Sequence, residues 1–290
     1  MARVLAALGL FGLCAALAPP GRVVVFGPGS AEMKMVSAKL MARAGFETTA
    51  LAPDDQITIW QRLMFGADGG DAVALSTNVG GSLGRAQALC LVCDNREMPE
   101  AQIASFLDAA PDARRVVLLS RMGASTAKPG PFGLASLETK LRACEETLRA
   151  AAAARDVELS IVRAGTLKGG GPGKVENGVV VSGVEYGLAK TYYDTLFDMT
   201  QWMCTTAYDQ FTLGADVSAG DSVAVSNPLL TMAAASDFSP RADETSRIVA
   251  GGALVAALSH DRPVEFSVGA AKAEAPPTAP EWETLLASLS

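Results

Sequence analysis

The residues best placed to do chemistry near the start of the chain are a glycine turn and the polar residues around it. Val23–Phe26 is an unbroken apolar run, typical of a strand buried on both faces, and Gly27, Gly29 and Ser30 follow it directly. Apolar residues at helical spacing come next, then a second strand that ends before Asp54. A glycine turn at a helix N-terminus offers backbone N–H groups and the positive end of the helix dipole to a pyrophosphate. This order predicts a dinucleotide-binding βαβ unit.

The fingerprint of this unit is incomplete. The G-x-G-x-x-G pattern requires glycine at position 32, where Glu32 adds negative charge beside the phosphate site. A βαβ unit that binds no nucleotide is the alternative. Asp54 and Asp55 follow the turn by about 20 residues, where a carboxylate binds the ribose 2′-hydroxyl of NAD. No cation is adjacent in sequence to receive the 2′-phosphate of NADP. We therefore expect NAD or NADP with a preference for NAD, or else two solvated turn acids.

Three later strands would bring polar residues to the same edge of a sheet. The strand over 86–93 ends before Asp94, the strand over 115–120 ends at Ser120, and the strand over 158–163 ends at Arg163, with Gly165 beyond it. Carboxyl ends of parallel strands meet at the ligand-binding edge of a doubly wound sheet. We expect Asp94, Ser120, Arg163 and Gly165 to lie around the cofactor.

Periodicity and turn residues predict the remaining elements. The expected elements are helices over 57–64, 99–109, 134–155 and 245–258, a strand over 71–76, a turn over 78–81, a glycine-rich loop over 165–173, an extended segment over 175–184, a partly helical segment over 186–213, a strand over 264–268 and a short last helix.

A block from Lys140 to Gly171 carries K-L-R-A-C-E-E-T-L-R on a helix and then a strand ending V-R-A-G-T-L-K-G-G-G. This block, with the tail E-T-S-R-I-V-A, V-E-F-S-V and E-A-P-P-T-A-P-E-W-E-T-L-L, resembles the atypical short-chain dehydrogenase/reductase family. That family includes NmrA-like regulators and NAD(P)-binding-domain proteins of plants and algae. The resemblance covers most of 22–290, although Ala164 replaces the proline of the family. It implies an α/β fold, a Rossmann-like doubly wound parallel sheet with a small C-terminal substrate-side region.

The resemblance also implies a catalytic set. Active members carry Tyr-x-x-x-Lys, whose lysine binds the nicotinamide ribose and lowers the tyrosine pKa, and a serine after the fifth strand assists. Lys140 fits the lysine and Ser120 the serine, but Ser136, a poor acid–base group, occupies the tyrosine position. Tyr186 begins a second Tyr-x-x-x-Lys sequence. Because this sequence follows the Arg163 strand, whereas the active pair of the family precedes that strand, we interpret it as a coincidence. The alternative is that Tyr186 or Tyr192 folds back over the cofactor and replaces the missing acid.

Composition narrows the classes of partner. The 290 residues are 49% apolar, so a sizeable core is expected, and the net charge is −7 without a basic cluster. Nucleic acid and anionic membranes are therefore disfavoured partners. Cys90 and Cys93 have metal-site spacing, but they lie in a strand where residues three apart face opposite sides, so we expect core cysteines and no metal site. The single histidine, His260, is expected at the surface before the last strand.

The chain divides into three parts by composition. Residues 1–20 contain the apolar run Val4–Ala18 and resemble a signal peptide; the alternatives are an extra buried segment or an incorrect gene start. Residues 21–174 are expected to form the NAD(P)-binding core, and 175–290 the rest of the same domain with a substrate-side or partner-binding segment. The leader and the algal-type tail imply a plastid location, with the secretory lumen or cytoplasm as alternatives. No spanning segment is expected in the mature chain.

Two functions follow as hypotheses. The first is an NAD(P)-binding oxidoreductase that lacks the usual catalytic tyrosine and acts on an unknown small molecule. The second is a cofactor-binding accessory, assembly or scaffold subunit of a photosynthetic complex, without turnover. A degenerate fold that binds no nucleotide is a third possibility.

Overall fold

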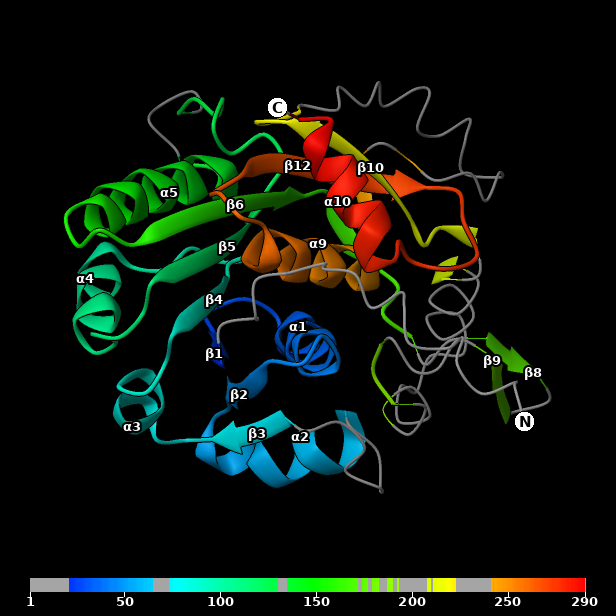
Figure 1. Ribbon diagram of the computed structural model, residues 1–290, viewed down its shortest axis with the longest axis horizontal. Coiled ribbons are helices and arrows are strands. Elements are labelled where there is room, and N and C mark those ends of the chain that lie inside the picture. The colour runs from blue at the N-terminus through cyan, green and yellow to red at the C-terminus, as the bar shows by residue number, and fades with distance from the viewer. Residues whose placement is uncertain are drawn as a thin grey trace, which may run out of the picture.

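The computed structural model describes residues 21–64, 73–129, 135–171, 174–176, 179–182, 187–189, 192, 208–209, 211–222, 241 and 243–289. A large sheet dominates this part, in the order β10-β12-β6-β5-β4-β1-β2-β3 (Figure 1). Neighbouring strands are parallel except for β10 and β12. Its strands are β1 (Arg22–Phe26), β2 (Glu47–Leu51), β3 (Val73–Ser76), β4 (Ala88–Val92), β5 (Arg115–Arg121), β6 (Glu158–Ala164), β10 (Gly214–Ala219) and β12 (Glu265–Ala271). The doubly wound parallel sheet is confirmed.

Helices cover both faces of this sheet, with α1 and α9 on one side and α4 and α5 on the other (Figure 1). The helices are α1 (Ala31–Arg43), α2 (Ile57–Met64), α3 (Val79–Leu83), α4 (Glu100–Asp108), α5 (Leu137–Ala153), α9 (Arg247–Ser259) and α10 (Ala279–Ala287), and η1 (Asp54–Gln56) is a 3₁₀ turn. Serine side chains begin three of them, since Ser30, Ser136 and Ser246 accept N–H bonds in the first turns of α1, α5 and α9.

Alternation along the buried strands divides the core in two. Val23 and Val25 face the core under α1 and α9, while Val24 faces the core under α4 and α5. Cys90 and Cys93 are buried free thiols in these two different cores, which confirms their assignment to opposite faces of the strand.

Three sequence predictions need correction or refinement, and two lie outside the described residues. Helix α3 forms where a turn was expected over 78–81, because Asn78 accepts the N–H of Gly81 and caps it. The loop over 165–173 contains β7 (Thr166–Lys168), which pairs with β11 (Glu244–Ser246). The extended segment over 175–184 contains the antiparallel pair β8 (Lys174–Glu176) and β9 (Val179–Ser182). Residues 1–20 and most of 186–213 lie outside the described residues.

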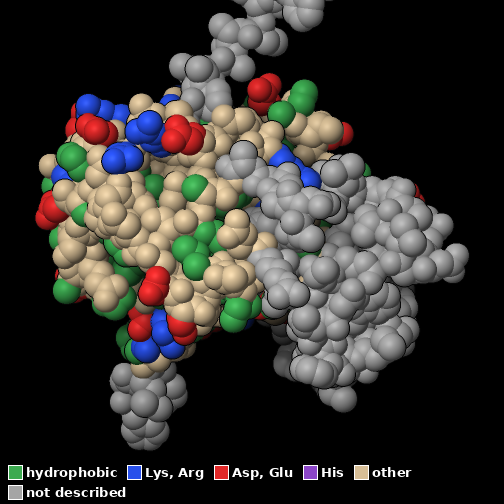
Figure 2. Space-filling model, turned by 90° about the horizontal axis from the view of Figure 1, so that it is seen from below, with side chains coloured by type: hydrophobic (Ala, Val, Ile, Leu, Met, Phe, Trp, Pro, Cys, Tyr) green, Lys and Arg blue, Asp and Glu red, His purple; other side chains and the backbone are tan. Residues whose placement is uncertain are grey.

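The surface of the described residues carries both signs of charge. Figure 2 shows Lys and Arg side chains beside Asp and Glu in small mixed groups on one face. The ion pairs at the surface include those of Arg22 with Glu47 and of Arg155 with Asp108. Within the described ranges, no helix is both long and apolar enough to cross a membrane.

Candidate functional site

The candidate site lies between β1 and β4, at the point where the order of the strands in the sheet reverses. Strand β1 has β2 on one side and β4 on the other, so the crevice outside their carboxyl ends is the usual ligand position in such sheets. The loop after β1 is held against β4 there, because the N–H of Gly29 donates to the carbonyl oxygen of Val92 at 2.9 Å.

Close approach explains both glycines of this loop. Gly27 has φ +131°, and a Cβ on it would lie 2.4 Å from the Val92 oxygen. A Cβ on Gly29 would lie 2.2 Å from Oδ1 of Asp94 and 2.7 Å from the Val92 oxygen. Only glycine fits either position.

We expect Gly27→Ala to lower the free energy of unfolding by about 1–3 kcal/mol, because the added methyl group strikes backbone atoms at an unfavourable φ. Urea unfolding measures this loss. Gly80→Ala is the matched control, since a Cβ there meets nothing within 4 Å. Equal effects of the two substitutions would contradict the packing argument.

Asp94 lies directly across the crevice from the start of α1. Its Oδ1 accepts the N–H of Ser30 at 2.8 Å, and its Oδ2 accepts the Ser30 hydroxyl at 2.7 Å. The predicted cofactor residues Ser30 and Asp94 are therefore brought together and bonded to each other. The next N–H groups, on Ala31 and Glu32, have no acceptor within the helix, as at any helix N-terminus.

Tyr192 covers this helix end from a distant part of the chain. Its hydroxyl donates a hydrogen bond to Glu32. Burial, followed by the bond to Glu32, raises the pKa of Tyr192 above its usual value. Tyr192 thus contacts the first turn of α1 through Glu32, and its replacement of the missing acid stays a prediction. Tyr186 lies outside the described residues.

A cation also lies at this crevice, although none was identified from the sequence. Lys34 Nζ donates to the carbonyl oxygen of Gly27 at 3.1 Å and lies 5.3 Å from the centre of the Trp60 ring. Burial lowers the pKa of Lys34, while the charges of Asp94 and Glu32 oppose that shift. Side chains on a helix lean toward its N-terminus, which is the signal that could have placed Lys34 over the loop.

Ser120 and the helix-borne residues do not form a joined catalytic set in the described contacts. Ser120 is 1% exposed at the end of β5, and its hydroxyl has no partner among the described residues. Lys140 lies on α5, where its Nζ is 3.3 Å from Glu97 Oε1. Ser136 caps α5 by accepting the N–H of Thr139 at 3.2 Å. Ser136, at the usual position of the catalytic tyrosine, thus stabilises the N-terminus of α5.

Arg163 points into an interior ion pair. Its Nε and Nη2 lie 3.0 and 2.6 Å from the two carboxylate oxygens of Glu145, and Nη2 lies 3.2 Å from Glu265 Oε2. Burial alone would lower the pKa of Arg163, but the hydrogen bond to Glu145 and the charges of Glu145, Glu265 and Asp221 together raise it. The side chains of Arg163 and Glu145 are both 1% exposed, so the Arg163 guanidinium forms a buried ion pair within the protein.

Two further predicted residues, Asp54 and Gly165, follow the carboxyl ends of β2 and β6. Asp54 is exposed in η1, just beyond the carboxyl end of β2. Gly165 donates its N–H to Thr245 Oγ1 at 2.9 Å, and a Cβ there would lie 2.5 Å from the Asp243 oxygen. Gly165 therefore fits β6 closely against the segment before β11.

Asp209 is a buried acid that the sequence did not identify. Its carboxylate accepts the N–H groups of Gly170 and Gly171 at 3.2 and 2.6 Å and the hydroxyl of Ser246 at 3.4 Å. It ties the glycine loop after β7 to the start of α9. Burial raises its pKa to about 6, against the lowering effect of these hydrogen bonds.

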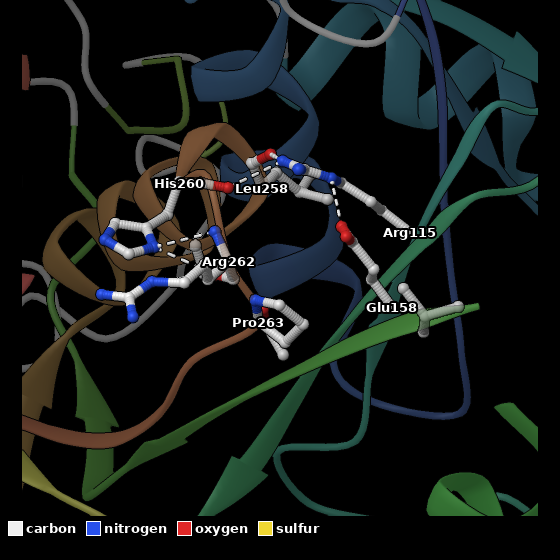
Figure 3. Close-up of a pocket in the computed structure, with 9 residues that line it drawn as sticks. Arg115, Glu158, Leu258, His260, Arg262 and Pro263 are labelled. Atoms are coloured by element: carbon white, nitrogen blue, oxygen red, sulfur yellow. Dashed lines mark hydrogen bonds and ion pairs between the residues drawn. The ribbon is translucent and has the colours of Figure 1, made fainter. Parts of the chain in front are cut away.

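A small cavity of about 10 Å³ lies at the opposite edge of the sheet (Figure 3). Arg115 donates to the carbonyl oxygens of Leu258 and His260 at 2.9 and 2.8 Å and pairs with Glu158 at 2.8 Å. These contacts satisfy the last carbonyls of α9. His260 ends α9 there, and its Nδ1 lies 3.0 Å from the Arg262 oxygen. This cavity has room for little more than one water molecule.

Comparisons with known proteins give the fold. No family model matches the chain, and no curated protein matches it. A wide-type short-chain dehydrogenase/reductase of Veillonella parvula, crystallised with NADP, is 12% identical with a TM-score of 0.50, over 89% of this chain and 100% of that one. A UDP-N-acetylglucosamine 4-epimerase of Bacillus cereus is 14% identical with a TM-score of 0.45, over 87% and 80%. The likeness to the Veillonella parvula structure is one of fold, and it confirms the expected Rossmann-like architecture. Among the described residues, no group of His, Cys, Asp and Glu could hold a metal ion.

Proposed function

We propose that this protein binds NAD or NADP at the crevice between β1 and β4, as an atypical short-chain dehydrogenase/reductase. The observation that carries this proposal is the loop of Gly27 and Gly29, which lies against β4 and directs the first turn of α1 at the crevice. Gly27, Gly29 and Ser30 would face the pyrophosphate, and Asp54 a ribose. The crystallised relative that contains NADP has the same fold.

The buried hydroxyl of Ser120 supports a bound ligand at the same edge. A polar atom in the interior normally has a hydrogen-bond partner, and Ser120 Oγ has none among the described residues. A substrate oxygen or the nicotinamide amide would supply that partner. The bound dinucleotide would supply hydride-transfer chemistry, and the chain's own part is to bind, orient and hydrogen bond through Ser120.

Titration of the protein with NADH and NADPH, followed by intrinsic fluorescence, tests this proposal. Binding of either cofactor is expected, with NADH favoured if Asp54 bonds the ribose and NADPH favoured if Lys34 meets the 2′-phosphate. Gly29→Trp is the blocked control, because its side chain would fill the space at Val92 and Asp94. Absence of binding to the unaltered protein would overturn the proposal.

We expect Glu32→Gln to tighten dinucleotide binding about tenfold, because one unit charge near the phosphates at intermediate dielectric is worth about 1–2 kcal/mol. Tyr192→Phe is expected to act in the opposite direction, since it frees the Glu32 charge from its hydrogen bond. The dissociation constants of NADH and NADPH give the measurement. Glu100→Gln is the matched control, because Glu100 is also an acid in the first turn of a helix. Unchanged affinity in Glu32→Gln would place the phosphates elsewhere.

A second candidate is a cofactor-binding accessory protein without turnover, as in a plastid complex. Two observations favour it: Ser136 serves as the cap of α5, and Lys140 is paired with Glu97. Tight cofactor binding without oxidation of NADPH by any carbonyl or quinone compound would support this candidate. Steady reductase activity would exclude it. Fusion of residues 1–20 to a fluorescent reporter tests the proposed plastid import.

A further inference from the structure

A second cavity, larger than the one beside Arg115, lies far from the crevice. It has a volume of about 280 Å³ and lies between the last turns of α1 and α9 and the helix α10. Parallel helices α1 and α9 both begin at the carboxyl edge of the sheet, so their last turns lie at the opposite edge. This cavity is therefore separate from the proposed dinucleotide site.

Apolar side chains form most of the cavity wall. Leu40 of α1, Val255 and Ala256 of α9, and Trp282 and Leu286 of α10 all line it. The volume is close to the lower end of the range of about 300–1,000 Å³ for small-molecule sites, which are mostly apolar with a few placed polar groups. The wall thus has the size and character of a ligand pocket.

Trp282 supplies an unpaired donor in this wall. Its side chain is 5% exposed, and its Nε1 would lie 3.1 Å from a Cβ on Gly252, which also lines the cavity. The indole N–H of Trp60 donates to Gln56 Oε1 at 3.0 Å, whereas the described residues contain no acceptor for that of Trp282. An indole N–H in an apolar wall can donate to an acceptor oxygen of a ligand in the cavity.

The charges of the lining point to an uncharged ligand. Arg43 and Glu283 contribute one positive and one negative group to the lining. Such a wall does not compensate a buried net charge on a ligand, which would cost several kcal/mol to desolvate. We propose that this cavity is a binding site for a small, uncharged, hydrocarbon-rich molecule with one acceptor oxygen, such as a ketone or ester, which accepts from Trp282.

Calorimetric titration of the full chain with 2-nonanone, nonanoate and nonylammonium tests the proposal. The ketone is expected to bind about tenfold more tightly than either ion of similar length, because each ion loses hydration in a wall whose one positive and one negative group leave no net countercharge. Equal affinities, tighter binding of an ion, or no binding of the ketone would overturn the proposal.

Two variants locate the binding. Ala256→Phe fills the cavity and is expected to weaken ketone binding about tenfold or more. Trp282→Phe keeps the ring but removes the donor, and should weaken binding about fivefold. Ile59→Phe is the matched control, because Ile59 is 54% exposed on α2, away from the cavity. Circular dichroism checks folding, and if Ala256→Phe does not fold, Trp282→Phe decides. Unchanged ketone affinity in a folded Trp282→Phe variant contradicts the assignment.

Discussion

Replacing Arg163 by methionine is expected to lower the free energy of unfolding by about 3–5 kcal/mol, because the buried Glu145 carboxylate loses both hydrogen bonds from Arg163 and keeps only Arg149, 3.6 Å away. Arg163 and Glu145 are each 1% exposed and are joined by two hydrogen bonds between helix α5 and strand β6. Removing one partner keeps the full desolvation penalty of the other. Denaturant unfolding followed by circular dichroism measures the loss.

Two further variants separate this ion pair from ordinary surface pairs. The double variant Arg163→Met with Glu145→Leu is expected to recover much of the loss, since an apolar pair of similar volume needs no compensation. Arg142→Met removes an exposed pair with Glu146 on the same helix and should cost about 0.5 kcal/mol or less. A loss in Arg163→Met no larger than that of Arg142→Met would show that the pair is hydrated in solution.

Raising the pH from 4 through 6 is expected to lower the free energy of unfolding of the unaltered protein relative to that of an Asp209→Asn variant. Burial raises the pKa of Asp209 from 3.8 to about 6. Because the folded state holds this proton more tightly than the unfolded chain, the stabilisation is complete below about pH 3.8 and is lost as the pH rises to about 6. A shift of about two units corresponds to about 3 kcal/mol.

Unfolding free energies at pH 4, 5, 6 and 7 measure this linkage. The free energy of the unaltered protein minus that of Asp209→Asn should fall by about 2.4 kcal/mol between pH 4 and pH 7, since only the aspartate loses a proton there. Asp108→Asn is the control, because Asp108 lies in an exposed pair with Arg155. A difference that stays constant, or that grows with pH, would mean that Asp209 is already ionised in the folded protein at pH 4.

The elements predicted well from the sequence are the strands that are fully buried, because burial on both faces requires an unbroken run of apolar residues. Strands β1, β4 and β5 are apolar runs buried on both faces, and they were found within two residues of their ends. Strand β10 was missed because Gly214–Ala219 is an edge strand with one partner and needs no apolar run. Strands β7 and β11 are three residues each, too short for any periodicity.

For the candidate site, the sequence predicted which residues lie at the ends of strands, but it did not predict the hydrogen-bond partners of their side chains. Ser120 and Arg163 are neighbours in register at the ends of β5 and β6, as expected. The direction of Arg163 depends on Glu145 and Glu265, which lie on two other elements. The bond between Tyr192 and Glu32 joins residues 160 positions apart, and no local pattern records such a contact.

The place of β12 in the sheet has a consequence for synthesis of the chain. Strand β12 fills the position between β6 and β10, and the N–H of Val264, just before it, donates to Ser160, 104 residues earlier. Helix α9, which precedes it, covers the apolar side of α1. A nascent chain that has left the ribosome as far as residue 240 would therefore carry a bare strand edge and an uncovered helix face. Chaperones bind such surfaces, and premature termination there would yield an aggregating fragment rather than a smaller stable domain.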